Sequence, residues 1–459
     1  MSLVEGLSAR HEVHVFAQTI EHHWPGVHYH RIRQPFARPR FLNQWWYAWA
    51  TWRQTRFGFD IVHAHENTWH GNVQTVHVLP VWIHYFALKP QRAQFLRQWC
   101  GARAREKILT ALKWLNVLLS PRLMSYLWLE HSRLKQGGRH VSRHITSVSA
   151  SLTEQLLGCF PLEPQRVHTL MPAVLGPLAW WRQAQERAHA VSPNPWLEVL
   201  LPSTLVGAHD VDTATAEFSS EFLISPALKA RARLALGLEL RLGLELELEL
   251  ELELELELEL GGAAHQPISQ WLLWVGHDDK KKGLSAIIQA LANLAPTVGL
   301  MVVGRGALSA SAKALAVKEG VASRVAWLGP MEDVSPAYWA CDVLVHPTLE
   351  DTFGMVVLEA MSWARAVVVS APEFCGITGH LTHAQEAWVL DDPTDVPALA
   401  QALTLTLEES RGRALATQAH AWAQAHTWQR VCEAQEAVYR AVLSQACVSA
   451  PLGQGAGHG

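Results

Sequence analysis

The 459-residue sequence predicts an α/β protein with two sheet-containing domains. Short apolar runs typical of buried strands alternate with longer helical patterns along both halves of the chain. Such alternation favours parallel sheets with helices on both faces. The chain is too long for one ordinary core, and a hydrophobic content of 49% is enough to bury two.

The first domain is expected over residues 1–175. Residues 1–10 resemble the end of a helix, and helical patterning covers 100–137, where Pro121 is expected to begin a new helix, and 150–157. Strand-like runs occupy residues 11–17, 60–65, 73–78 and 145–149.

The middle of the chain, residues 176–263, is interpreted as an insertion and low-complexity linker. Its first part has no clear periodicity, and a helix-like run follows at 227–238. Leu and Glu then alternate strictly from Leu244 to Leu260. As a strand this repeat would place every Leu on one face, whereas a helix would spread the Leu side chains around its circumference. A low-complexity expansion without chemistry is favoured over a functional acidic tether.

A second, Rossmann-like domain is expected over residues 264–410, followed by closing helices and a tail over 411–459. Its predicted strands are 271–275, 298–303, 325–329, 343–345 and 366–370. Its predicted helices include 284–294 and 310–319.

Composition excludes several classes of function. The net charge of −4, with no basic arm, argues against a nucleic-acid partner. The six cysteines lack metal-ligand spacing and indicate buried thiols in a reducing compartment. No apolar run approaches the ~20 residues that span a bilayer, and no signal pattern is present. We therefore expect a cytoplasmic protein, and contact with a membrane surface stays open.

The most informative segment runs from Asp351 to Met361. Asp351 and Glu359 lie eight positions apart around the pair Phe353-Gly354, between a predicted strand that ends at Pro347 and a predicted helix. The N-terminus of a helix favours anions. Two acids beside such a terminus could hold hydroxyl groups on either side of a bound phosphate. This arrangement suits a nucleotide sugar.

This segment resembles the carboxylate–seven–carboxylate signature of retaining glycosyltransferases of family 4. The family pattern usually begins with Glu, and Asp351 stands in that place. The resemblance extends over most of 264–410 and, more weakly, over 1–175. It implies two Rossmann-like domains facing a cleft (GT-B type), no metal or other cofactor, and a nucleotide-sugar donor. It also implies that Glu359 binds the ribose and that Asp351 contacts the transferred sugar.

A loop of three lysines, Gly276 to Gly283, follows a predicted strand and precedes a predicted helix. In the resembled family an Arg often follows the first Gly and a Lys precedes the second; His277 and Lys282 take those places. Cations here can neutralise a leaving diphosphate, and Lys281 or Lys280 would compensate for the His. A lysine run by itself is more often a solvated surface. The expected donor-binding residues are His277, Lys281, Lys282, Phe353, Gly354 and Glu359.

On the first domain, the resemblance implies a histidine facing the transferred sugar, and His77 stands at the end of the strand 73–78. We expect His77 and Asp351 to be the catalytic residues, with His65 and Glu66 as weaker candidates. A zinc site from His63, His65, His70 and His77 is conceivable, but scatter over several strand ends argues against it.

Members of the resembled family begin with a strand and a glycine-rich loop, whereas this chain begins at what resembles the following helix. The N-terminal domain is therefore expected to lack its first strand. The overall hypothesis is a retaining glycosyltransferase acting on a glycan or glycolipid acceptor in cell-envelope polysaccharide or lipopolysaccharide synthesis. The alternative is a catalytically impaired nucleotide-sugar-binding protein of the same fold, and a nucleotide-sugar epimerase is less favoured.

Overall fold

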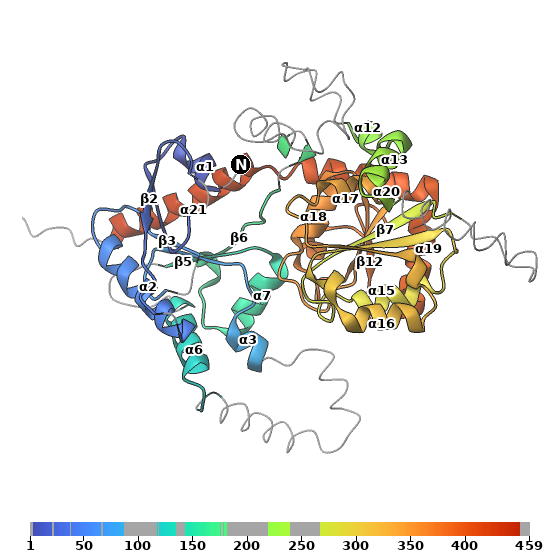
Figure 1. Cartoon of the computed structure of the whole chain (residues 1–459). Helices are drawn as coiled ribbons and strands as arrows, with labels where there is room; N and C mark the ends of the chain where they lie inside the picture. The colour runs from blue at the N-terminus through green and yellow to red at the C-terminus, as the bar shows by residue number, and fades with distance from the viewer. Residues whose placement is uncertain are drawn as a thin grey trace, which may run out of the picture. The chain divides into compact units, whose positions relative to one another are not determined.

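The computed structural model divides the chain into two compact units (Figure 1). Unit 1 contains Met1–Pro172 and Trp428–Gly459, and unit 2 contains Ala173–Thr427. The structure describes residues 3–20, 23–36, 38–65, 68–86, 117, 119–134, 143–174, 176–177, 179–180, 219–238 and 267–449. The Leu/Glu repeat, Glu66 and most of the predicted insertion lie outside these residues.

Unit 1 holds two parallel sheets in its described residues. One pairs β1 (Val13–Ala17) with β2 (Val27–Arg31), and the other has four strands in chain order. These four are β3 (His63–Ala64), β4 (Val73–Val76), β5 (His144–Ser147) and β6 (Val167–Thr169). The predicted strands at 11–17, 73–78 and 145–149 are confirmed, whereas β2 and β6 were not predicted.

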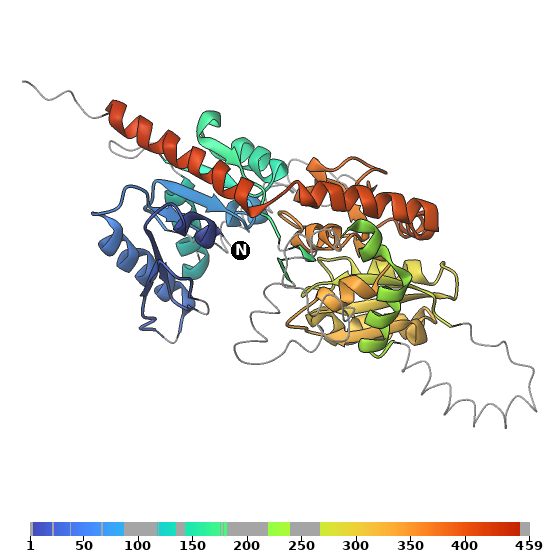
Figure 2. The same ribbon diagram turned by 90° about the horizontal axis from the view of Figure 1, so that it is seen from above.

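The helices of unit 1 include one contributed by the end of the chain. They are α1 (Leu3–Ser8), α2 (Arg40–Thr55), α3 (Val81–Phe86), α6 (Pro121–Leu134), α7 (Ala150–Cys159) and α21 (Trp428–Ser449). The predicted helix starts at Pro121 and Ala150 are confirmed. Val438 and Val442 of α21 pack on Val73 of β4, so the C-terminal helix helps to form the core of unit 1 (Figure 2).

Unit 2 is a six-stranded parallel sheet in the order β12-β11-β10-β7-β8-β9. Its strands are β7 (Gln270–Val275), β8 (Val298–Val303), β9 (Val325–Gly329), β10 (Val343–His346), β11 (Ala366–Ser370) and β12 (Trp388–Leu390). All five predicted strands are confirmed, and β12 is an addition. The order is that of the doubly wound Rossmann fold, with the reversal between β7 and β10.

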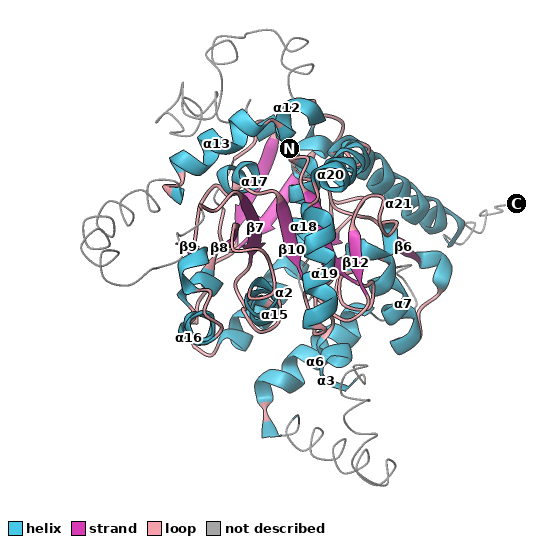
Figure 3. Cartoon of the chain, turned by 90° about the vertical axis from the view of Figure 1, so that its right-hand side faces the viewer, coloured by secondary structure: helices cyan, strands magenta, loops and turns pink. Residues whose placement is uncertain are grey.

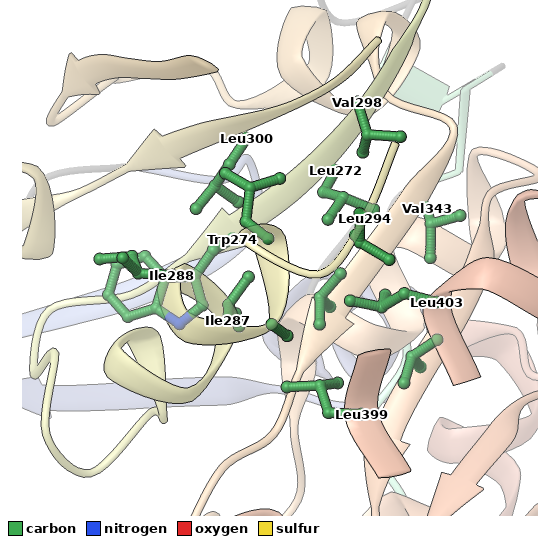
Figure 4. Packing of buried hydrophobic residues seen from close by; sticks show 14 of the residues in the cluster. Leu272, Trp274, Ile287, Ile288, Leu294, Val298, Leu300, Val343, Leu399 and Leu403 are labelled. Carbon is green, nitrogen blue, oxygen red and sulfur yellow. The ribbon is translucent and has the colours of Figure 1, made fainter. Parts of the chain in front are cut away.

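Both faces of this sheet are buried, and Figure 3 shows helices on both sides of it. Leu272 and Trp274 of β7 join one core cluster, and the intervening Leu273 is buried as well because successive side chains alternate across a strand. Helices α15 (Leu284–Leu291) and α19 (Val396–Leu407) supply the other side of that cluster, seen close by in Figure 4. The remaining helices are α12 (Ser220–Ile224), α13 (Pro226–Ala235), α16 (Ala310–Lys318), α17 (Ser335–Ala340), α18 (Met355–Ser362) and α20 (Glu409–Gln424).

Helices α12 and α13 are held on the sheet of unit 2 by partly buried ion pairs and by one buried guanidinium. Lys229 and Arg233 of α13 form ion pairs of 2.6 and 2.8 Å with Asp342. The buried guanidinium of Arg365 donates to the backbone oxygens of Leu223 and Cys341. This described part of the predicted insertion is therefore fixed to the six-stranded sheet of unit 2. Among the described residues, no helix combines the length and the apolar character needed to cross a membrane.

Candidate donor-binding site

The candidate site lies where the strand order of unit 2 reverses. In open α/β sheets, ligands bind beyond the carboxyl ends of the strands at this point. The lysine loop follows β7, and the loop with Asp351 follows β10, the two strands that pair across the reversal. The topology thus brings together two motifs about seventy residues apart in the sequence.

The two loops meet in an ion pair. Lys282 Nζ lies 2.5 Å from Asp351 Oδ2, and His346 Nε2 lies 3.0 Å from the same oxygen. Lys282 Nζ also donates to the backbone oxygen of Glu350 at 3.3 Å. One carboxylate oxygen therefore receives a cation and an imidazole at once.

Backbone contacts hold the loops at this separation. The Leu349 N–H donates to the Lys281 oxygen at 2.8 Å, and the Thr348 hydroxyl donates to it at 3.1 Å. Gly283 has a φ of +69°, and a Cβ there would lie 2.0 Å from the backbone oxygen of Pro347. Only glycine allows this close approach. The lysines are thus positioned by main-chain geometry as well as by charge.

The charges at the ion pair are fixed by their surroundings. Burial raises the pKa of the Asp351 carboxyl, but the hydrogen bond from His346 and the hydrogen bond and charge of the Lys282 ammonium outweigh it and hold that pKa well below its usual range. Burial lowers the pKa of His346 against the opposing effect of Asp351. Nδ1 of His346 has no hydrogen-bond partner among the described residues, which suits a neutral ring that donates from Nε2. Lys282 then supplies the positive charge.

The Phe353-Gly354 turn aims the helix that follows it. Gly354 precedes α18 with φ of +95° and ψ of 57°, and a Cβ there would lie 2.7 Å from Cys375 Sγ. Phe353 is buried, and its backbone oxygen accepts the Ile377 N–H at 2.7 Å. Asp351 itself is tied to the segment after β11 through its own N–H and oxygen. The N-terminus of α18, with its partial positive charge, therefore lies directly after the turn that carries Asp351.

Glu359 lies in α18 and has a different environment. The Tyr338 hydroxyl of α17 donates to Glu359 Oε2 at 2.6 Å. Burial raises the pKa of Glu359, and the Tyr338 hydrogen bond opposes that rise only in part. Of the two acids, Asp351 is thus held ionised by partners, and Glu359 is held in place by a neutral donor.

The remaining predicted donor residues lie at the surface of the lysine loop. His277 and Lys281 are exposed, and Lys281 Nζ lies 3.5 Å from Glu350 Oε1. The loop is closed by Asp278, whose Oδ1 accepts the Lys281 N–H at 2.9 Å. The structure brings Lys282 and Asp351 into contact, and it leaves His277 and Lys281 available to a ligand.

His77 follows β4 in unit 1 and lines a pocket of about 190 Å³. Its ring lies 6.4 Å from that of His65, and Glu130 and Arg133 line the same pocket. Burial, then the charges of His77 and Arg133, lower the pKa of His65 to about 4. Glu130 accepts the N–H groups of Val81 and Trp82 at the start of α3.

Unit 1 also has a larger hollow, of about 510 Å³, at the carboxyl ends of β1 and β2. Its lining is rich in neutral hydrogen-bonding side chains. They are Gln18, Thr19, Gln34, Asn43, Gln44, Tyr47 and Tyr126, with Arg40 as the charged member. Such a surface can bind hydroxyl groups without requiring a charged ligand.

Sequence reasoning did not predict the lining of this hollow, nor His346, Tyr338, Glu130 and Arg133 at the other sites. His346 ends β10 directly before Pro347, and this strand-end position was the available signal for it. Tyr338, Glu130 and Arg133 lie within helices, and their roles depend on tertiary contacts that no local pattern encodes.

Two family models match the chain. One, described as Glycosyltransferase Family 4, covers residues 1–174, and the other, described as Glycosyl transferases group 1, covers residues 269–409. Lipopolysaccharide glucosyltransferase WaaG of Escherichia coli (strain K12) is 34% identical over 143 residues, which are 30% of this chain and 37% of that protein. D-inositol 3-phosphate glycosyltransferase of Mycobacterium bovis (strain BCG / Pasteur 1173P2) is 27% identical over 185 residues, 38% of this chain and 37% of that protein. The chain thus aligns with little more than a third of either relative.

Solved structures match over nearly the whole chain. The crystal structure of WaaG has a TM-score of 0.59 at 19% identity and covers 96% of this chain and 94% of that one. Sucrose-phosphate synthase from Thermosynechococcus elongatus has a TM-score of 0.57 at 18% identity, covering 96% and 92%. Anabaena HepE in complex with UDP and glucose has a TM-score of 0.51 at 13% identity, covering 91% and 86%. These likenesses confirm the predicted fold class, α/β with two Rossmann-like domains of the GT-B type.

Proposed function

Because this chain belongs to the two-domain glycosyltransferases of family 4, we propose that it transfers a sugar from a nucleotide-sugar donor to a glycan or glycolipid acceptor with retained anomeric configuration. The observation that carries the proposal is the ion pair between Lys282 and Asp351 at the reversal of the unit 2 sheet. It joins a cation suited to a diphosphate with a carboxylate suited to sugar hydroxyls, at the place where this topology binds nucleotides.

The donor diphosphate is assigned to the lysine loop and the N-terminus of α18. Cleavage of the donor leaves negative charge on the departing diphosphate, and a cation fixed before the reaction stabilises that charge. Lys282 is held by Asp351 and the backbone oxygen of Glu350, so little reorganisation is needed. Lys281 extends the positive surface of the same loop, and the exposed His277 offers ring nitrogens for hydrogen bonds. Glu359, oriented by Tyr338, is assigned to the ribose hydroxyls.

Asp351 is assigned to binding the transferred sugar rather than to nucleophilic attack. Its Oδ2 already receives Lys282 and His346, and a carboxylate with two donors and a depressed pKa is a weak nucleophile. With Asp351 assigned to binding, the base next to the breaking bond is the oxygen of the departing diphosphate. In the proposed reaction it accepts the proton of the acceptor hydroxyl while that hydroxyl attacks from the same face, which retains the configuration.

The acceptor is assigned to unit 1. His77, with His65, Glu130 and Arg133 around the smaller pocket, would contact the sugar being transferred. The amide-rich hollow at the ends of β1 and β2 would hold acceptor hydroxyl groups. The name of the WaaG relative supports a lipopolysaccharide acceptor, and the ligands of HepE support a UDP-sugar among the donors. We propose that the reaction takes place in the cytoplasm, at the inner face of the membrane.

A panel of nucleotide sugars tests this function. The purified chain is incubated with each donor, with and without lipopolysaccharide-core acceptors, and compared with Glu359→Ala. We expect donor hydrolysis or transfer above background in the wild type and its loss in the variant. If wild type and Glu359→Ala both showed only the background rate, the chain would not be a transferase, and a nucleotide-sugar-binding protein would remain. Isomerised donor among the products would indicate an epimerase.

A further inference from the structure

A second group of side chains with binding chemistry lies on the two-stranded sheet of unit 1. Glu12 precedes β1, His14 lies within β1, and His28 lies opposite His14 on β2. Among the residues that the structure describes, this is the one group of three His, Cys, Asp or Glu side chains whose ligand atoms all lie within 4.8 Å of one another. It shares no residue with the donor site or with the pockets of unit 1.

Strand register creates the group. His14 and His28 are direct partners in a parallel pair, so their side chains leave the same face of the sheet. Their rings stack with centroids 4.7 Å apart, and the ring of His30 lies nearly parallel to that of His14 at a centroid distance of 5.2 Å. Three imidazoles from the two strands, and the carboxylate of Glu12 just before β1, thus lie close together.

The spacing of the ligand atoms fits a small metal ion. His14 Nε2 lies 3.1 Å from Glu12 Oε1, and His28 Nε2 lies 3.8 Å from the same oxygen. Two ligands at zinc-bond lengths in a tetrahedral arrangement are separated by roughly 3.4 Å, midway between these values. The third pair, between ring nitrogens of His14 and His28, lies within 4.8 Å, so side-chain rotations that bring all three pairs to about the tetrahedral separation would complete three corners of a tetrahedron.

The neighbouring residues provide the support that a metal-binding histidine needs. His14 Nδ1 lies 2.9 Å from His30 Nε2, so a hydrogen bond between these rings orients His14, and a metal ion bound at His14 Nε2 would require His14 to donate from Nδ1. The edge of the Phe59 ring abuts His14 at a centroid distance of 5.2 Å. Glu12 and His28 are exposed, so an ion can enter from solvent.

From this geometry we propose that Glu12, His14 and His28 bind a first-row divalent cation of the zinc class, with the fourth position left to solvent. Imidazole and carboxylate ligands suit zinc, nickel and copper. The ion would join β1 to β2. Because a two-stranded sheet has little stability of its own, the bridge would stabilise this part of unit 1.

Zinc titration of the full chain, with any affinity tag removed, tests the proposal. The variants are His14→Gln and His28→Gln, and His131→Gln is the control because His131 is an exposed histidine of the same unit. We expect one zinc ion to bind wild type and control with equal affinity, and each ligand variant to bind it at least about tenfold more weakly. Zinc should also raise the thermal unfolding midpoint of wild type and control, and not that of the variants.

Two results would overturn the proposal. The first is the absence of zinc binding by the wild type. The second is equal affinity in all four proteins, which would show that zinc binds other histidines of this His-rich chain. His28→Gln keeps the test valid if His14→Gln folds poorly, since the His28 side chain is 58% exposed and its loss leaves no buried gap. Unfolding midpoints without zinc report the fold of each variant.

Discussion

The side chains at the strand ends of the two units differ in their charge states. In unit 2, a cation and a carboxylate are paired across two loops, and the carboxylate is kept ionised. In unit 1, His63 and His65 lie close to each other and to Arg133, and desolvation and the neighbouring positive charges lower their pKa values, which favours the neutral rings. The first arrangement suits a charged diphosphate, and the second suits neutral hydroxyl groups. The difference supports a division of labour in which unit 2 binds the donor and unit 1 the acceptor.

The largest expected effect comes from removing the cation. Lys282→Met leaves Asp351 without its ion-pair partner and the diphosphate without its fixed positive charge. We expect sugar transfer to fall by about 10²-fold or more, the range seen when one preorganised donor is removed. Lys318→Met is the control, since Lys318 is an exposed lysine of the same unit, on α16. Equal rates of sugar transfer in Lys282→Met and Lys318→Met would argue against the assignment of the diphosphate to Lys282.

The turn before α18 gives the next effect. Gly354 has a positive φ, and a Cβ there would lie 2.7 Å from Cys375 Sγ. Gly320 also has a positive φ, of +70°, but a Cβ there would have nothing within 4 Å. We expect Gly320→Ala to lower the free energy of unfolding by about 1 kcal/mol and Gly354→Ala to lower it by more. Urea unfolding measures both. Only Gly354→Ala should also weaken nucleotide-sugar binding, so a matching loss in Gly320→Ala would argue against the role of this turn.

A pH titration sharpens the comparison of charge states. Folding lowers the pKa of His65 to about 4 from 6.5, because burial and then the charges of His77 and Arg133 disfavour its cation. Between these values the unfolded chain binds more protons, so this contribution to stability is complete above pH 6.5 and falls as the pH is lowered towards 4. Urea unfolding at pH 5 and pH 7 should show a smaller pH difference for His65→Gln than for wild type.

Asp351→Asn is the control for that titration. The depressed pKa of Asp351 contributes stability that is present above its ordinary value of 3.8 and is lost only below it. The loss of the Asp351 carboxylate itself should therefore not reduce the stability change between pH 5 and pH 7. Because Asp351 opposes the lowering of the His346 pKa, its removal should enlarge that change. Two results would contradict the assignment of charges. One is a smaller stability difference between pH 5 and pH 7 in Asp351→Asn than in wild type, and the other is an unchanged stability difference in His65→Gln.

Tyr338→Phe should have the smallest effect. It removes the hydroxyl that donates to Glu359 Oε2 and leaves the packing of the ring in place. Because that hydrogen bond lowers the pKa of Glu359, its loss should raise this pKa further. We expect donor affinity to fall by about 1 kcal/mol, roughly fivefold, measured by titration calorimetry. Unchanged affinity would mean that Glu359 does not depend on Tyr338.

The sequence predicted unit 2 better than unit 1, for physical reasons. Strands such as β8 are continuous apolar runs because both faces are buried. In contrast, β2 alternates Val and Tyr with His, and β12 has only three residues, so neither gave a clear signal. Helix α2 carries four tryptophans, which obscure its apolar stripe.

The candidate site was predictable only in part. Lys282, Asp351 and Glu359 lie in local motifs that a known family shares. The contact of His346 with Asp351 and that of Tyr338 with Glu359 depend on how separate elements pack, which the sequence alone did not indicate. The histidine group on β1 and β2 required the register of the two strands, and β2 was not predicted.

A crystal structure of the chain with a bound nucleotide sugar tests the central claim most directly. The account predicts the diphosphate within contact of Lys282 Nζ and of the first N–H groups of α18, with Glu359 on the ribose. A diphosphate bound away from both loops, with the ion pair of Lys282 and Asp351 undisturbed, would contradict it.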